Sequence, residues 1–175
     1  MLAARRHRRP RPAGMSDVPV DGLDGILSAV AGDGVPAIPA GPLAHYLEEM
    51  SAVDPDTLSR DGALAYWIDL YNAGALDLAR RTDQAGEESV WRVPGAFRTP
   101  FVEVAGEWLS LDGIEHGKVR RFGDPRVHAA LVCGSWSCPT LRPEAYRGAA
   151  IDGQLEDQMQ SFLAAGGAVA DPAAG

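Results

Sequence analysis

Cysteine is scarce in this sequence, and so are long apolar runs. The 175 residues include two cysteines, too few for the disulfide framework of a small secreted domain. No stretch reaches the roughly 20 apolar residues that a membrane-spanning helix needs, and the arginines near the start are not followed by the apolar core of an export signal. We therefore expect a soluble, cytoplasmic protein without a membrane partner.

Positive charge is also scarce beyond the first few residues. Five arginines precede Met15 and every acidic residue follows it, which leaves 11 of the 16 basic residues against all 24 acidic ones, a net charge of −13 from Met15 onward. Such an acidic body repels phosphate backbones, so nucleic acid is not expected as a partner. Residues 1–16 are expected to be a disordered basic arm, or an upstream start with Met15 as the true initiator.

Length and composition predict one compact domain. With 46% hydrophobic residues, the chain can bury one ordinary core. Residues 17–42 are rich in Gly, Pro, Ala and Asp and are expected to be a loosely packed lead-in, with a short helix near 23–31. The domain proper is expected over 43–165, and residues 166–175 are expected to fray.

Hydrophobic spacing predicts three helices in this domain. The strongest signal lies at 60–81, where apolar residues recur at steps of three and four and form one stripe: Leu64, Trp67, Ile68, Tyr71, Ala75 and Leu78. Weaker patterns predict helices at 43–50 and 151–163. Asn72 lies at the edge of the stripe, with Asp69 further round. We interpret Asn72 either as a structural hydrogen-bonding residue or as part of a substrate-binding site.

Two segments predict a small sheet. Residues 101–109 alternate apolar and polar side chains around Ala105-Gly106, which is typical of a β-hairpin. Residues 127–133 are apolar and partly β-branched, which indicates a short buried strand after the break at Asp124-Pro125. With the helices, these strands predict an α+β fold in which several helices pack on a small sheet containing the hairpin and the 127–133 strand.

A further helix, predicted at 111–121, carries a candidate acid. Ser110 is a typical N-cap, and Asp112 lies in the first turn, where the helix dipole favours negative charge. Glu115 falls near the middle of the apolar stripe, so its carboxylate needs a partner. Lys118, three residues further on, is the simplest partner, and the alternative is a role for Glu115 in a site.

Cysteines and histidines cluster between residues 116 and 138. The cluster contains His116, His128, Cys133 and Cys138, with Arg126 nearby. A catalytic thiol needs a thiolate, which a neighbouring imidazole, a cation or a helix start favours. On a regular strand His128 and Cys133 face opposite ways, because they are five residues apart. We therefore favour Cys138 as a nucleophile, paired with His116 or His128.

Three other interpretations of these residues stay open. Two thiolates and two imidazoles could complete a zinc shell, but their spacing matches no standard zinc module, and we predict neither a metal nor a cofactor. The two cysteines could instead form a reversible disulfide. They could also be small buried hydrophobes in a non-catalytic interaction domain, whose polar residues form a structural network.

Three ordered motifs resemble a known family. They are Ala65-Tyr-Trp-Ile-Asp-Leu-Tyr-Asn-Ala73, Leu109-Ser-Leu-Asp-Gly-Ile-Glu-His116 and Asp124-Pro-Arg-Val-His-Ala-Ala-Leu-Val-Cys-Gly-Ser-Trp-Ser-Cys-Pro139. In these motifs the sequence is similar to the domain-of-unknown-function 547 family, and the resemblance extends over residues 43–163. It implies a domain that occurs in bacteria and plants without an established activity.

The resemblance also marks candidate site residues. By motif position it implies a set of eight: Asn72, Glu115, His116, Arg126, His128, Cys133, Cys138 and Pro139. At position 69 this sequence has Asp, where the family is expected to favour Asn.

The leading hypothesis from the sequence is thiol-dependent acyl transfer or amide hydrolysis on an unknown small molecule or peptide. The roles would be shared among the clustered residues, with Cys138 or Cys133 as nucleophile, His116 or His128 as base, Glu115 or Asn72 as orienting group, and Arg126 as an anchor for an anionic substrate.

Overall fold

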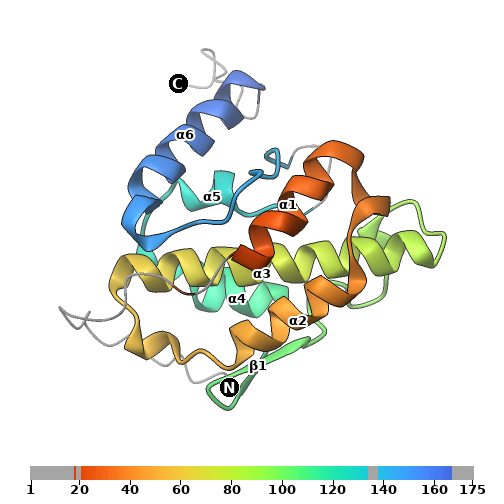
Figure 1. The fold of residues 1–175 in the computed structure, drawn as a ribbon, viewed down its shortest axis with the longest axis horizontal. Coiled ribbons are helices and arrows are strands. Elements are labelled where there is room, and N and C mark those ends of the chain that lie inside the picture. Colours follow the sequence, from red (N-terminus) through yellow and green to blue (C-terminus); the bar gives the residue numbers. More distant parts are fainter. Residues whose placement is uncertain (1–17, 19–20, 134–137, 167–175) are drawn as a thin grey trace, which may run out of the picture.

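One long helix, α3 (Arg60–Gln84), runs through the centre of the molecule (Figure 1). The structure, a computed structural model, describes residues 18, 21–133 and 138–166. Every residue of α3 from Gly62 to Gly74 is buried. A helix that is enclosed in this way needs apolar side chains all round, so the predicted single stripe covers only part of its packing surface.

Two helices precede α3. α1 (Asp21–Asp33) packs on α2 (Ala40–Ser51), and α2 packs along α3, where the Tyr66 hydroxyl donates to the Met50 carbonyl at 2.8 Å. The segment expected to be a loosely packed lead-in thus adds a helix to the core. It does so because α1 buries three apolar side chains at helical spacing: Leu23, Ile26 and Leu27.

The predicted hairpin is confirmed. β1 (Val102–Val104) pairs antiparallel with β2 (Glu107–Leu109), with Val102 opposite Leu109. Between the strands, Ala105 and Gly106 have φ angles of 50° and 78°, the left-handed pair that a two-residue type I′ turn requires. Within the described ranges, these two strands make up the whole sheet.

Gly74 lets the chain beside the hairpin approach α3 closely. A Cβ atom at this position would overlap the ring of Phe101, the residue before β1, and would lie 3.1 Å from a Leu111 methyl group. No side chain larger than hydrogen fits here unless that ring moves. The glycine therefore sets the separation between α3 and the hairpin.

The helix predicted at 111–121 is shorter than expected. α4 (Leu111–Gly117) begins after Ser110, whose hydroxyl accepts from the Gly113 N–H at 3.1 Å, so the predicted N-cap is confirmed. The chain then tightens into the 3-10 turn η4 (Val119–Phe122), as helix ends often do. This turn buries both Val119 and Phe122.

The strand predicted at 127–133 is wrong. Val127–Ala130 forms a short helix, α5, and the extended backbone begins only at Leu131. The Asp124 carboxylate accepts from the Arg126 N–H at 2.9 Å, and the Pro125 carbonyl accepts from the His128 N–H at 3.3 Å. An Asp-Pro pair is a typical helix start, and here its effect exceeds that of the apolar, partly β-branched residues that follow.

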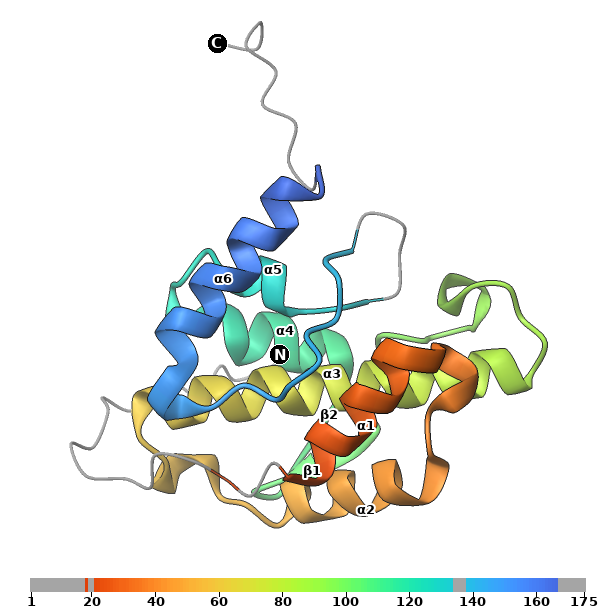
Figure 2. The same ribbon diagram turned by 45° about the horizontal axis from the view of Figure 1, so that its top comes forward.

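The chain then crosses α3 to reach the last helix, α6 (Ile151–Ala164). Residues 138–147, called here the returning segment, pass between α1 and α6, as Figure 2 shows. Four further 3-10 turns complete the described structure: η1 (Val35–Ala37), η2 (Pro55–Thr57), η3 (Val90–Arg92) and η5 (Gly148–Ala150).

The predicted α+β class is confirmed by the six helices and one hairpin of the described residues. No helix in these ranges is both long and apolar enough to cross a membrane. The expected basic arm at 1–16, and all but the first residue of the expected tail at 166–175, lie outside the described residues.

Candidate dithiol site

Two polar residues lie within the buried stretch of α3. Asp69 is 1% exposed and Asn72 is 4% exposed. Because they are three residues apart, their side chains lie on the same face of the helix. Each of them holds one of the two chain segments that carry the cysteines: residues 131–133, called here the outgoing segment, and the returning segment.

Asn72 holds the outgoing segment through both ends of its amide. Its Nδ2 donates to the Ala130 carbonyl at 3.0 Å, and its Oδ1 accepts from the Val132 N–H at 3.0 Å. The side chain thus satisfies backbone groups that would otherwise need a neighbouring strand. It fixes the backbone immediately before Cys133, in keeping with the structural interpretation of this residue.

Asp69 holds the returning segment. Its Oδ1 accepts from the Tyr146 N–H at 3.0 Å, whereas its buried Oδ2 has no hydrogen-bond partner in the described part of the chain. Burial raises the pKa of the Asp69 carboxyl well above its usual range, and the single N–H donor only partly offsets this effect. Folding therefore favours the protonated form of Asp69 more than the unfolded chain does.

The hydroxyls of Tyr46 and Tyr146 are further buried groups near Asp69. Among the described residues neither has a hydrogen-bond partner. Burial is the main cause that raises the pKa of each hydroxyl, and the negative charge of Asp69 raises both further. An ionised Asp69 would therefore disfavour a negative charge on the hydroxyl of either tyrosine.

Helices α1 and α6 complete the hold on the returning segment. Asp24 of α1 accepts from the Ala145 N–H at 2.7 Å and pairs with the Arg147 guanidinium at 2.5 Å. Gln154 of α6 accepts from the Arg147 N–H at 2.8 Å and donates to the Ala145 carbonyl at 2.9 Å. With Asp69 of α3, side chains from three helices hold the consecutive amides of residues 145–147.

The two held segments bring the cysteine sulfurs together. Cys133 ends the outgoing segment and Cys138 begins the returning one, and their Sγ atoms are 2.6 Å apart. Cys138 Sγ also accepts from the Cys133 N–H at 2.9 Å. The two cysteines are not joined by a disulfide bond, and both are half-buried. Since an S–S bond measures about 2.05 Å, a movement of roughly half an ångström would join them.

A contact from α6 lies close to this pair. Two residues beyond Cys138, the Thr140 carbonyl accepts from the Gln158 side chain at 2.6 Å. Gln158 is buried, so α6 also holds the chain near the start of the returning segment. The position of Cys138 therefore depends on α6 as well as on α3.

Tyr71 of α3 is a buried residue whose hydroxyl is influenced by Glu115 and by both cysteines. The pKa of the Tyr71 hydroxyl is raised mainly by burial, and next by the charges of Glu115, Cys133 and Cys138. Ionisation of the Tyr71 hydroxyl is therefore disfavoured both by its burial and by these neighbouring groups.

The predicted ion pair between Glu115 and Lys118 is wrong. Glu115 pairs with Arg120 at 2.7 Å, and Lys118 pairs with Glu107 of β2 at 2.7 Å. The cause is the early end of α4, because Lys118 leaves helical geometry with φ −119° and ψ −71°. The side chains three residues apart therefore no longer lie above one another.

The two histidines lie at the surface. His116 is in the last turn of α4 and His128 is in α5, and both are exposed, whereas both cysteines are half-buried. The strand argument that set His128 and Cys133 on opposite faces no longer applies, because His128 is helical. Among the described residues, no group of three or more His, Cys, Asp or Glu side chains is placed to hold a metal ion.

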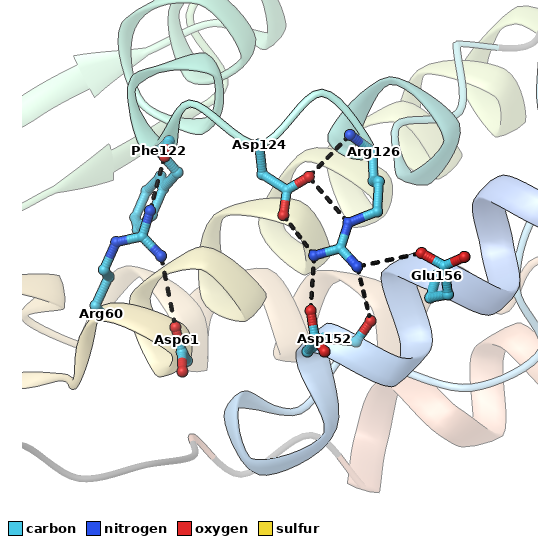
Figure 3. Close-up of polar contacts among 7 residues, drawn as sticks. All are labelled: Arg60, Asp61, Phe122, Asp124, Arg126, Asp152 and Glu156. Carbon is cyan, nitrogen blue, oxygen red and sulfur yellow. Dashed lines mark hydrogen bonds and ion pairs between the residues drawn. The ribbon is translucent and has the colours of Figure 1, made fainter.

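Arg126 lies in a network of carboxylates that joins the start of α5 to α6 (Figure 3). Its guanidinium pairs with Asp124 at 2.8 Å, with Asp152 at 2.7 Å and with Glu156 at 3.4 Å. The hydrogen bonds that Arg126 donates to Asp124, and then to Asp152, raise the pKa of Arg126. An anion approaching this side chain meets three carboxylates, so the surroundings favour a tether over the predicted substrate anchor.

Residues that hold the returning segment were missed by sequence reasoning. Asp24 and Gln154 belong to no spacing motif, because their partners are backbone groups as far as 121 positions away. One signal was available in the sequence: Asp69 stands in an otherwise apolar part of a strongly predicted helix. A carboxylate in that setting must find a donor elsewhere in the fold.

Comparison with known proteins gives a family and nothing closer. The family model described as "Protein of unknown function, DUF547" matches residues 55–163. The match covers α3, the hairpin, α4, α5, both cysteines and most of α6. The chain has no match among curated proteins and none among solved structures.

Proposed function

The chain belongs to the domain-of-unknown-function 547 family, and, since that family's description names no activity, we propose from the geometry that Cys133 and Cys138 form a reversible dithiol–disulfide centre. The observation that carries the proposal is the 2.6 Å separation of the two Sγ atoms. Two thiols so close together are suited to thiol–disulfide exchange. They are less suited to a reaction that needs one isolated thiol.

The contacts of Cys138 favour it as the attacking thiol. Its Sγ accepts the Cys133 N–H, and hydrogen-bond donors favour the thiolate over the thiol. Cys133 is then the resolving thiol.

The proposed reaction is exchange with a disulfide of the glutathione or protein-disulfide class. The Cys138 thiolate attacks one sulfur of that disulfide, its S–S bond breaks, and the other sulfur leaves as a thiolate that takes a proton. Cys133 then loses its proton and attacks Cys138 Sγ, which releases the second sulfur of the substrate as a thiol. The centre loses two electrons, and the substrate disulfide gains them.

Thiol-dependent acyl transfer has less support in the geometry. A base must lie within hydrogen-bond reach of the nucleophile, whereas both imidazole rings are exposed and both sulfurs are half-buried. A second thiol 2.6 Å from the first would also compete with any acyl substrate, because it would close a disulfide under mild oxidation.

The test is a redox titration of the full chain. The protein is equilibrated in buffers of varied glutathione ratio, trapped with an alkylating reagent and weighed by mass spectrometry. We expect one intramolecular disulfide with a midpoint between about −270 and −120 mV, the range of thiol–disulfide exchange proteins. Cys133→Ser and Cys138→Ser variants, which can form only mixed disulfides, are the controls.

Two results would overturn the proposal. In one, both thiols are alkylated even in the most oxidising buffer. In the other, the disulfide has a midpoint below about −300 mV, which is typical of a structural disulfide. An acyl-transfer centre would instead leave one thiol far more reactive than the other and would form no disulfide.

A further inference from the structure

Asp69 and Asn72 together contact both segments that carry the dithiol. Asn72 bonds Ala130 and Val132 on the outgoing side, and Asp69 bonds Tyr146 on the returning side. One helix face therefore holds the backbone on either side of the two sulfurs.

The two side chains that hold these segments lie in a tightly enclosed part of the core. Asp69 and Asn72 are both almost fully buried in the part of α3 that is enclosed on all sides. Neither side chain has an exposed surface from which water could replace its backbone partners. Motion of either segment away from α3 therefore breaks a buried hydrogen bond.

We propose that Asp69 and Asn72 are the positioning residues of the dithiol, and that they set its redox potential by holding Cys133 and Cys138 at bonding distance. This inference rests on the proposed redox function. A dithiol whose sulfurs are held together has a high effective concentration, and a higher effective concentration stabilises the disulfide over the two thiols.

The main test compares Asn72→Ala and Asp69→Ala with the wild-type chain in the glutathione titration. Each variant releases one segment, so we expect the effective concentration of the thiols to fall at least tenfold. A tenfold fall corresponds to a midpoint about 30 mV less negative. The wild-type chain in concentrated urea gives the value for two thiols without any positioning.

A matched control separates positioning from general stability. Thr82 is also buried in α3, but its hydroxyl donates to the Leu78 carbonyl of the same helix at 2.8 Å. We expect Thr82→Ala to lower the free energy of unfolding and to leave the redox midpoint unchanged. An equal shift in Thr82→Ala would overturn the inference, because loss of stability alone would then explain the effect.

Conservative variants keep the test decisive if the alanine variants do not fold. Asp69→Asn retains an oxygen that accepts from the Tyr146 N–H, so we expect it to keep the wild-type midpoint. Asn72→Ser can bond only one of the two backbone groups, so we expect at least a threefold fall in effective concentration. A wild-type midpoint in folded Asn72→Ser or Asn72→Ala would overturn the inference.

The two proposals fail in different ways. If the wild-type chain forms no reversible disulfide, the redox function itself is wrong. If the wild-type chain forms one, and the Asn72 and Asp69 variants share its midpoint and its rate of disulfide closure, only the positioning role is wrong.

Discussion

The buried face of α3 and the surface of α6 hold the same part of the chain by different means. Asp69 and Asn72 use hydrogen bonds to backbone groups, and their side chains are only 1% and 4% exposed. Arg126 and Arg142 use ion pairs whose carboxylates on α6 are largely exposed, with Asp152 at 89% and Asp157 at 65%. Water can replace the second kind of contact and not the first, so the buried face should determine the geometry and the ion pairs should add a weaker tether.

The largest effect is expected for Asn72→Ala. This change leaves the buried Ala130 carbonyl and the part-buried Val132 N–H without their side-chain partner. Each such group costs about 1 to 3 kcal/mol, so we expect the free energy of unfolding to fall by about 3 kcal/mol. Urea denaturation followed by circular dichroism measures it. A loss below about 1 kcal/mol would show that water reaches this face and would remove the contrast with α6.

The next effect is a change of pH dependence in Asp69→Asn. Folding raises the pKa of Asp69, so the native state holds this proton more tightly than the unfolded state does. The stability from this group is complete below its unfolded pKa of about 3.9 and is lost as pH rises through the native pKa. In that window the wild-type chain loses up to about 1.4 kcal/mol per pH unit from this one group.

Asparagine cannot ionise, so Asp69→Asn should lack this loss. Unfolding free energies of both chains from pH 4.5 to pH 8 give the comparison, and the advantage of the variant should grow with pH. Parallel profiles would mean that Asp69 is ionised in the folded protein at a normal pKa.

A smaller effect is expected at the surface for Arg126→Met. The change removes ion pairs with Asp124, Asp152 and Glu156 but keeps most of the apolar stem. We expect a loss of about 1 kcal/mol or less at low ionic strength, and a smaller loss in about 0.5 M salt. A loss as large as that of Asn72→Ala, or one that salt does not change, would place this network with the buried contacts.

The smallest expected effect is a change in how the stability difference between wild-type and Arg126→Met chains depends on acidic pH. Hydrogen bonds from Arg126 lower the pKa of Asp124, so the stability from this pair is present above the unfolded pKa of about 3.9 and is lost as pH falls through the lower native value. The difference between wild-type and Arg126→Met chains should therefore shrink below pH 4. A difference that is constant from pH 2 to pH 6 would show that charge pairing does not cause it.

Much of the fold could be predicted from local patterns. The apolar spacing of α3, the Ala105-Gly106 turn and the Ser110 cap each depend on residues within a few positions of one another, and all three are confirmed. The strand at 127–133 was wrong even though its signal was also local. Asp124-Pro125 favours a helix start and the apolar run favours a strand, and in the folded chain the helix start prevails.

The candidate site was predictable in part. The closeness of Cys133 and Cys138 in the sequence already permitted a disulfide, and Asn72 stood out as a polar residue beside an apolar stripe. The partners of Glu115 and the role of Asp69 were not predictable, because they depend on where α4 ends and on how the returning segment crosses α3.

The sequence by itself determined the family, the α+β class, the main helices and the hairpin, because periodicity, caps and turns act over a few residues. Only the tertiary structure decided which thiols meet and what holds them there. The contacts that α1 and α3 make with these segments join residues 58 to 123 positions apart, and such contacts form only when helices pack and water is excluded from between them.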